Sequence, residues 1–276
     1  MATLPISVCM IAGPEAHRIG RTLESVAGWT SELVVVLNEE VRDGTDKIVQ
    51  QYGGKVFRER WKGFRDQKNS AAHKATQDWI LNLDADEVVS TELREEIQRV
   101  FANEQSKQFA AFSFPRLSWY CGRWIRHGDW YPDRCTRLWR RGQAEWAGGD
   151  VHEKLKVNGP IGRLNCDLHH YSRESINAHL QKIIPFSDEF VREHARSGEK
   201  PGCIALSVRP FWRFLRAYFF RLGILDGWPG YYIACHTAFS TVVRYAKLRE
   251  SLERCSPGAE IPTPKESEAH TSGLAR

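Results

Sequence analysis

The sequence lacks long apolar segments and paired-cysteine motifs. No run of about 18 apolar residues occurs, which excludes a membrane-spanning helix by the usual length criterion. The seven cysteines are scattered and no two stand in a Cys-x-x-Cys arrangement, so we expect reduced thiols rather than a disulfide framework or a zinc ribbon. The first residues lack the basic segment and cleavage site of a signal peptide. These absences predict a cytoplasmic protein.

The rest of the composition is that of an ordinary globular protein. Of its 276 residues 42% are hydrophobic, which is enough to bury the core of one large α/β domain with appendages. The formal net charge is +5. We find no internal repeat, and the basic residues are concentrated toward the carboxyl-terminal end of the chain.

Strand-like and helix-like segments alternate through residues 6–83. Segment 33–37 is almost continuously apolar, as in strands buried on both faces of a sheet, and Ile19, Leu23 and Val26 recur at helical spacing. Thr45 is expected to cap the helix that follows it, and another helix is expected to begin near Thr91. The alternation predicts an α/β fold with a parallel, doubly wound sheet that binds ligands beyond the carboxyl ends of its strands. The expected strands cover residues 6–11, 33–37, 55–57 and 79–83, and the first three expected helices cover residues 19–26, 45–52 and 64–75.

The last of these strands runs into the acidic segment Asp84-Ala85-Asp86-Glu87. Residues i and i+2 of a strand point the same way, so we expect Asp84 and Asp86 to share one face. Two neighbouring carboxylates resist joint ionisation unless a cation lies between them. The pair is therefore a candidate site for Mg²⁺ or Mn²⁺ bound to a diphosphate. The alternative is a solvated acidic turn after a buried strand.

The order of short motifs along the chain resembles that of glycosyltransferase family 2, and in particular the branch that contains lipopolysaccharide-core β-glucosyltransferases. The resemblance covers residues 4–250 and implies a GT-A fold, a nucleotide-sugar donor, a divalent metal ion and inversion at the anomeric carbon of the sugar. The motifs are Ile-Ser-Val-Cys-Met-Ile (6–11), Leu-Glu-Ser-Val (23–26), Val-Val-Val (34–36), Asp-Gly-Thr (43–45), Gln-Lys-Asn-Ser-Ala (67–71), Leu-Asp-Ala-Asp-Glu (83–87), Trp-Tyr-Pro-Asp-Arg (130–134), Leu-Trp-Arg-Arg-Gly (138–142), Val-His-Glu (151–153) and His-His-Tyr-Ser (169–172).

The resemblance implies a metal and donor site. Asp84 and Asp86, the latter more directly, would bind the metal ion and the diphosphate. His170, or its neighbour His169, would complete the metal site, since neutral imidazole binds Mn²⁺. Arg65, Lys68 and Asn69 could reach the phosphate or nucleoside groups of the donor through a cation or an amide. Asn38 could bond a base or ribose edge, and the carboxylate of Glu39 could substitute for the aspartate that many members have there.

Inverting transfer needs a base that takes the proton of the acceptor hydroxyl. The candidate bases are Asp133, Asp150 and Glu153, and by resemblance Glu153 matches the position best, with Asp150 second. The alternative for Glu153 is a structural ion pair with Arg134 or Arg137.

Two segments depart from the family pattern. Gly13-Pro14-Glu15-Ala16 stands where many members have Asn-Glu-Glu, and residues 37–45 form a run that is one residue longer than usual. The nucleotide, which the resemblance gives as UDP, is therefore less firmly predicted than the fold. A non-catalytic nucleotide-sugar-binding protein is one alternative. A nucleotidyltransferase is another, but it would need a glycine-rich phosphate loop that residues 13–18 do not supply.

Residues 209–249 combine basic and aromatic side chains. Such a segment on a helix is typical of an interfacial membrane-binding element, and it could also pack in the core or contact a second subunit in a homodimer. Nucleic-acid binding is not expected. With a glycolipid or lipopolysaccharide-core acceptor, we expect a peripheral position at the inner face of the cytoplasmic membrane. The basic residues of segment 209–249 are Arg209, Arg213, Arg216, Arg221, Arg244, Lys247 and Arg249.

The expected organisation is a catalytic domain at residues 1–197, this helical region at 203–250 and a disordered tail at 251–276. A hinge is expected at residues 197–202, where Gly and Pro are frequent. The aromatic and basic segment 119–126 is interpreted either as a sugar-stacking acceptor wall or as an ordinary hairpin.

Overall fold

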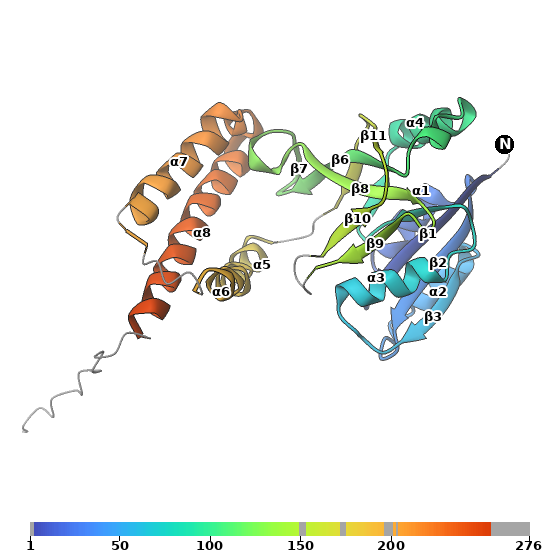
Figure 1. Cartoon of the computed structure of the whole chain (residues 1–276), viewed down its shortest axis with the longest axis horizontal. Helices are drawn as coiled ribbons and strands as arrows, with labels where there is room; N and C mark the ends of the chain where they lie inside the picture. Colours follow the sequence, from blue (N-terminus) through green and yellow to red (C-terminus); the bar gives the residue numbers. More distant parts are fainter. Residues whose placement is uncertain (1–2, 149–152, 172–174, 196–200, 203, 255–276) are drawn as a thin grey trace, which may run out of the picture. The chain divides into compact units, whose positions relative to one another are not determined.

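The computed structural model describes residues 3–148, 153–171, 175–195, 201–202 and 204–254. The chain divides into two compact units (Figure 1): the first contains residues 1–176 and 215–234, and the second contains residues 177–214 and 235–276. The first unit carries the sheet and its flanking helices, and the second is helical. Most of the hinge expected at 197–202 lies outside the described residues.

The elements alternate between strand and helix up to β4, as expected, and strands dominate after α4. The strands are β1 (Leu4–Ala12), β2 (Thr30–Asn38), β3 (Lys55–Glu59), β4 (Trp79–Asn82), β5 (Glu87–Val89), β6 (Ala111–Tyr120), β7 (Arg123–Ile125), β8 (Asp133–Arg140), β9 (Ala144–Ala147), β10 (Lys154–Val157), β11 (Ile161–Arg163) and β12 (Leu168–His170). The helices and helical turns are α1 (Ile19–Val26), α2 (Thr45–Gln51), α3 (Phe64–His73), α4 (Thr91–Ala102), η1 (Gln105–Gln108), η2 (Gly128–Trp130), α5 (Ile176–Gln181), α6 (Ile183–His194), η4 (Ile204–Val208), α7 (Arg209–Leu215), η5 (Arg216–Phe220), η6 (Gly223–Asp226) and α8 (Gly227–Arg254).

Ten of the described strands form one sheet, with a path β3-β2-β1-β4-β8-β6-β12-β5 and with β7 and β11 paired to β6. Strands β3, β2, β1 and β4 are parallel, whereas β8 is antiparallel to both β4 and β6. Strands β9 and β10 form a separate antiparallel ribbon. The α/β architecture with a Rossmann-like parallel half is therefore confirmed, and the carboxyl ends of its four parallel strands meet at one edge.

Side chains of successive strand residues enter different core clusters on the two faces of the sheet. Val8 and Met10 pack with α1, α2 and α4, while Cys9 packs with α3. In α1 the apolar residues Ile19, Leu23 and Val26 are fully buried, as their spacing predicts. Helices on both faces explain why β2 is apolar almost throughout.

The start of α2 differs from the expected one. Thr45 is the first helical residue, and its cap is Gly44, which has a left-handed backbone with φ 92° that glycine adopts without steric cost. Asp43 accepts bonds from both the backbone N–H (3.0 Å) and the hydroxyl (2.6 Å) of Thr45. The Thr45 hydroxyl accepts from the N–H of Glu15, so it fixes the loop after β1 instead of capping its own helix.

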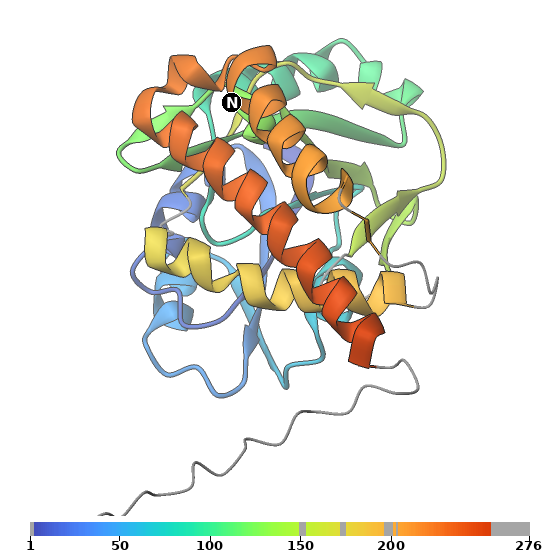
Figure 2. The same cartoon turned by 90° about the vertical axis from the view of Figure 1, so that its left-hand side faces the viewer.

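The second unit consists of helices, with α7 beside α8 and with α6 crossing α8 (Figure 2). In α6, Asp188 pairs with Lys247 of α8, and Phe190 packs edge-on against Tyr245 at 5.3 Å. Helix α8 runs to Arg254, so the first residues of the expected disordered tail are helical, and the rest lies outside the described residues. None of the described helices has the length and apolar character needed to span a membrane.

The basic residues of segment 209–249 are divided between the two units. Arg216 and Arg221, in the first unit, both contact the carboxylate of Asp129, at 3.1 and 3.2 Å. Arg209 and Arg213 belong to the second unit. In the first unit the buried Asp226 accepts bonds from the backbone N–H groups of Arg126 and His127. Asp129 and Asp226 thus fix residues 215–226 to the β6–β8 region.

A buried carboxylate makes stability depend on pH. Glu32 of β2 accepts from the Ser7 hydroxyl, from the Thr76 N–H at 2.8 Å and from Lys55 at 2.8 Å. Burial alone would raise the pKa of Glu32, but these bonds outweigh it and lower the pKa to about 2. A carboxylate with a lowered pKa stabilises the fold above its unfolded-state pKa, and this stabilisation is lost as pH falls through the folded value.

We expect Glu32→Gln to lower the free energy of unfolding at pH 7 by about 1.5–3 kcal/mol, because it removes bonds to a charged acceptor. The difference from the parent should shrink as pH falls from about 4.5 toward about 2. Thermal unfolding at stepped pH checks this. Glu92→Gln, on an exposed position of α4, is the control, and a difference that stays constant down to pH 2 would contradict the linkage.

Candidate active site

The two aspartates of the acidic segment lie in a turn and not on a strand face. Strand β4 ends at Asn82, and the backbone N–H of Glu87 bonds to the carbonyl of Asp84 at 3.0 Å. The strand periodicity on which we based a shared face does not extend into the turn, yet the two carboxylates remain close enough for the charge of Asp84 to oppose ionisation of Asp86. Both still lie at the carboxyl edge of the parallel strands, where the topology places ligands.

Asp84 is held by two cations. Arg137 of β8 donates to Asp84 Oδ2 at 2.6 Å, and Lys68 Nζ of α3 lies 3.7 Å from Oδ1. Burial would raise the pKa of Asp84, but the charges of Arg137 and Lys68 outweigh it and hold the pKa well below its ordinary value. Asp84 is therefore an anion at neutral pH.

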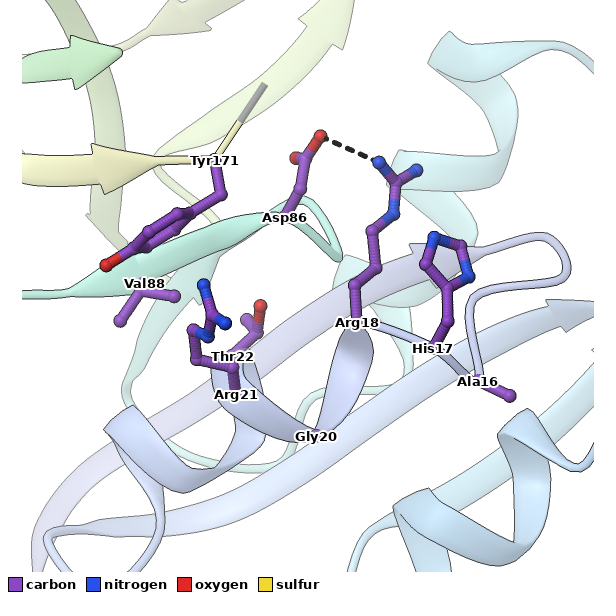
Figure 3. Close-up of a pocket in the computed structure, with 9 residues that line it drawn as sticks. All are labelled: Ala16, His17, Arg18, Gly20, Arg21, Thr22, Asp86, Val88 and Tyr171. Carbon is purple, nitrogen blue, oxygen red and sulfur yellow. Dashed lines mark hydrogen bonds and ion pairs between the residues drawn. The ribbon is translucent and has the colours of Figure 1, made fainter. Parts of the chain in front are cut away.

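Asp86 has a different set of partners, shown in part in Figure 3. Arg18 Nη1 is 3.3 Å and His170 Nε2 is 3.6 Å from the same oxygen, Asp86 Oδ2. Burial raises the pKa of Asp86, and His170 and Arg18 more than compensate, so the pKa lies below its ordinary value. The other ring nitrogen of His170 is 3.2 Å from the Ser118 hydroxyl, and Glu15 forms a bidentate pair with Arg18.

Glu153 lies beside Lys68, which connects it to Asp84. Lys68 Nζ donates to Glu153 Oε1 at 2.9 Å and lies over the Trp146 ring, 4.6 Å from its centroid. Glu153 is thus ion-paired, as the alternative expected, but its partner is this lysine and not Arg134 or Arg137. Within the described residues Glu153 Oε2 has no hydrogen bond. The second candidate base, Asp150, lies outside the described residues, as does His152.

The third candidate base is part of a structural ion pair. Arg116 donates to Asp133 Oδ2 through two nitrogens, at 2.6 and 2.9 Å, and also contacts Glu87 at 3.1 Å. Asp133 therefore serves to neutralise Arg116. His169 points away from its neighbour His170: its ring packs on Trp124 at 4.5 Å, and burial lowers its pKa.

The expected donor-binding residues do not all lie at the carboxyl ends of the parallel strands. Asn38 ends β2 at the same edge as Asp84, and Glu39 is exposed next to it. Asn69 instead bonds both backbone groups of Trp146, at 2.9 Å each, and so fixes β9 to α3. Arg65 pairs with Asp66 and donates to the Gly148 carbonyl.

The segment 119–126 is a hairpin. Strands β6 and β7 pair with Ser118 opposite Ile125, and Cys121 and Gly122 between them have positive φ values of 47° and 81°. The Trp119 and Trp124 rings meet edge to face at 5.1 Å, with Trp119 exposed. The structure is thus compatible with both interpretations of this segment, since the hairpin displays an aromatic side chain.

Arg137 and Arg18 were not among the expected site residues. Arg137 is 5% exposed and contacts both Asp84 and the fully buried Glu87, at 2.6 and 2.8 Å. Arg137 lies in a strand with three other charged residues, Asp133, Arg134 and Arg140, so the sequence did not single it out as the buried one. Arg18 stands just before α1, and nothing in its sequence neighbourhood indicates Asp86 as its partner.

The side chains gathered here supply only part of a metal-binding site. In the described part of the chain no group of three or more His, Cys, Asp or Glu side chains could hold a metal ion. Asp86 and His170, however, offer an oxygen and a nitrogen 3.6 Å apart. Mg²⁺ and Mn²⁺ at phosphate sites commonly use one or two protein ligands together with phosphate oxygens and water. The pair therefore fits an ion that arrives with a diphosphate.

A pocket of about 150 Å³ adjoins Asp86 on the α1 side (Figure 3). Arg21 lies over the Tyr171 ring at 4.4 Å, and the Tyr171 N–H bonds to the Asp86 carbonyl. Arg18 and Arg21 give this wall a positive charge next to the acidic turn.

Comparison with known proteins identifies relatives over most of the chain. Residues 7–154 match the family model described as Glycosyl transferase family 2. A protein of Rickettsia felis named "Uncharacterized glycosyltransferase" is 33% identical over 262 residues, covering 90% of each chain. The "Lipopolysaccharide core biosynthesis glycosyltransferase LpsC" of Rhizobium meliloti is 28% identical over 223 residues, covering 78% of this chain and 81% of that one.

Among solved structures, S. aureus TarS 1-349 in complex with UDP-GlcNAc superposes with a TM-score of 0.49 and 15% identity. The superposition covers 91% of this chain and 92% of that one.

Proposed function

The chain belongs to glycosyltransferase family 2, and we propose that it is a metal-dependent, inverting enzyme that moves a sugar from a nucleotide-sugar donor to a glycolipid or lipopolysaccharide-core acceptor. The observation that carries this proposal is the arrangement Glu153–Lys68–Asp84 beside Asp86–His170, at the carboxyl edge of the parallel strands. It combines a carboxylate base, cations for phosphate charge and a metal-binding pair.

Glu153 is the proposed base. One oxygen, Oε1, accepts from Lys68, so Oε2 is the atom that takes the proton of the acceptor hydroxyl. As that proton leaves, the hydroxyl oxygen forms a bond to the anomeric carbon, and the bond from this carbon to the donor phosphate breaks. Lys68 fixes the position of the carboxylate through this bond, as a positioned base requires.

The departing nucleoside diphosphate carries the electron pair of the broken bond. Lys68, Arg137 and Arg18 place positive charge along the acidic turn where this charge develops. A Mg²⁺ or Mn²⁺ ion held by Asp86 and His170 would act as a Lewis acid and stabilise the negative charge of the departing diphosphate. Asp84, paired with Arg137, orients the guanidinium and Lys68.

The residues that contact the donor's nucleoside are proposed from their place at the carboxyl end of β2. Asn38, the last residue of β2, and Glu39, the next residue, would contact the nucleoside, which we propose to be uridine. The N–H groups of Glu15 and Ala16 are bonded to Thr45 and Asp43, so this loop does not offer them to a phosphate as a nucleotidyltransferase loop would. The relative LpsC, by its name, acts in lipopolysaccharide core biosynthesis, which supports the acceptor class.

A peripheral membrane position is part of the proposal. Phe211 and Trp212 of α7 are large aromatic residues with more than a third of their surface exposed, and Arg209 and Arg213 flank them. This combination suits the interface of an anionic bilayer, where a lipid-linked acceptor would be met.

We expect the parent protein to release nucleoside diphosphate from at least one member of a nucleotide-sugar panel, and to require Mn²⁺ or Mg²⁺ for it. Asp86→Asn should raise the Mn²⁺ concentration for half-maximal release by at least about tenfold, since even the partners of metal ligands matter at that scale. Asp78→Asn, exposed at the opposite end of β4, is the matched control. Unchanged release in EDTA would contradict the metal site, and no release from any donor would favour a non-catalytic binding protein.

A further inference from the structure

The second unit contains a pocket of about 370 Å³ with a basic and aromatic wall. Three arginines from two helices gather at it: Arg209 and Arg213 from α7 and Arg244 from α8. Its other walls are aromatic, aliphatic and hydroxyl side chains, and among the described residues that line it there is no carboxylate. The complete lining is Phe190, Val208, Arg209, Trp212, Arg213, Thr241, Arg244 and Tyr245.

Arg244 is the central cation of this pocket. Its side chain is only partly exposed, and in the described parts of the chain it has no hydrogen bond or ion pair. Burial, and then the neighbouring charge of Arg213, lower the pKa of Arg244. The fold thus tolerates an unfavourable concentration of positive charge at this point.

The neighbouring side chains hold the cluster in a shape suited to an anion. Arg209 lies over the Tyr245 ring, 5.2 Å from its centroid, and donates to the Tyr245 hydroxyl. Phe190 packs edge-on against the same ring. Tyr245 is therefore fixed from two sides and positions Arg209 in turn.

We propose that this pocket binds a phosphate group carried by a saccharide or a lipid headgroup. Guanidinium groups present planar, paired donors that match phosphate oxygens, and a dianion would neutralise most of the cluster. Trp212, Phe190 and Tyr245 provide apolar faces for the body that carries the phosphate. The pocket volume is in the range of small-molecule sites.

If the proposed function holds, the bound phosphate is a group of the acceptor molecule. An acceptor anchored through its phosphate by the second unit would be selected for that group, independently of the donor chemistry in the first unit. The inference therefore deepens the proposed function, yet the binding step can be measured without turnover.

The test uses the full chain and two probes that carry a phosphate monoester. Glucose 6-phosphate is titrated by calorimetry against glucose, and phosphatidic acid vesicles are compared with phosphatidylcholine vesicles by co-sedimentation. We expect binding of at least one phosphate probe, weakened about tenfold or more in Arg213→Gln/Arg244→Gln, because charge-assisted bonds to phosphate are lost. Binding of glucose 6-phosphate indicates a free phosphorylated saccharide as the source, and binding of the vesicles alone indicates a lipid headgroup.

Arg192→Gln/Arg254→Gln removes the same charge from the same unit, at side chains that are 70% and 79% exposed. This control should bind like the parent. Because Arg244 is partly buried, Arg209→Gln/Arg213→Gln, at two exposed positions, is the second variant if the first does not fold. Binding of neither probe by the parent, or equal binding by a folded pocket variant, overturns the proposal. Donor hydrolysis is measured alongside, so a failure of the pocket with intact hydrolysis is distinguished from a failure of the proposed function.

Discussion

Replacing Glu153 by Gln should lower the turnover number by about 10²–10⁴-fold, the usual cost of losing a positioned general base. Glutamine keeps the size of the side chain and an oxygen that can accept from Lys68, but it cannot take a proton. The affinity for the donor should therefore change little.

Steady-state kinetics with donor and acceptor varied separately measure this effect. Glu145→Gln is the matched control and should retain parental turnover. Glu145 is exposed and lies in β9, which pairs with β10. If Asp150→Asn lowers turnover to that extent and Glu153→Gln does not, the base is Asp150. If neither variant loses turnover, the assignment of the base to this segment is wrong.

The second large effect concerns stability. Arg137→Met should lower the free energy of unfolding by about 3–5 kcal/mol, the range found when one partner of a buried ion pair is removed. Glu87 is fully buried and would keep only Arg116 as a cationic partner, and Asp84 would keep only Lys68. Urea unfolding with an unchanged m-value is the measurement.

Combining Arg137→Met with Glu87→Gln should recover part of this loss, because the unpaired buried charge is removed as well. Arg141→Met, one residue beyond β8 and exposed, is expected to stay within about 0.5 kcal/mol of the parent, as surface substitutions usually do. The pair is not coupled if the double variant loses as much free energy of unfolding as the two single variants together. A loss of similar size in the Arg141→Met control would also contradict the prediction.

The parts of the fold that local sequence determines were predictable. Strands β1 to β4 follow from short apolar runs, helix α1 follows from apolar periodicity, and the position of the acidic turn follows from the topology of a parallel sheet. The motif order predicted the family, which the relatives confirm. Lys68 and Glu153 were selected separately from their motifs, and the structure places them in contact.

Contacts that depend on strand pairing were not predictable. Arg137 reaches Asp84 because β8 inserts antiparallel beside β4, with Leu138 opposite Leu81, and no local pattern encodes that pairing. Strand β4 likewise ends at Asn82, so Asp84 and Asp86 lie in a turn that strand periodicity does not describe. The arginines of the basic segment look equivalent in sequence, yet Asp129 takes two of them because of where residues 215–226 fold back.

The contact between Arg18 and Asp86 has a consequence for how the site is loaded. On the proposed function, the guanidinium contacts the same carboxylate oxygen that a divalent ion would use, so binding of the ion would exchange one cation for another. An exchange changes the local charge less than the filling of an empty acidic site would. A displaced Arg18 would keep Glu15 as its partner just before α1, and its Nη1 would become available to the oxygens of an incoming diphosphate. A single side chain would thus serve as a substitute counter-ion before the donor arrives and as a donor contact afterwards.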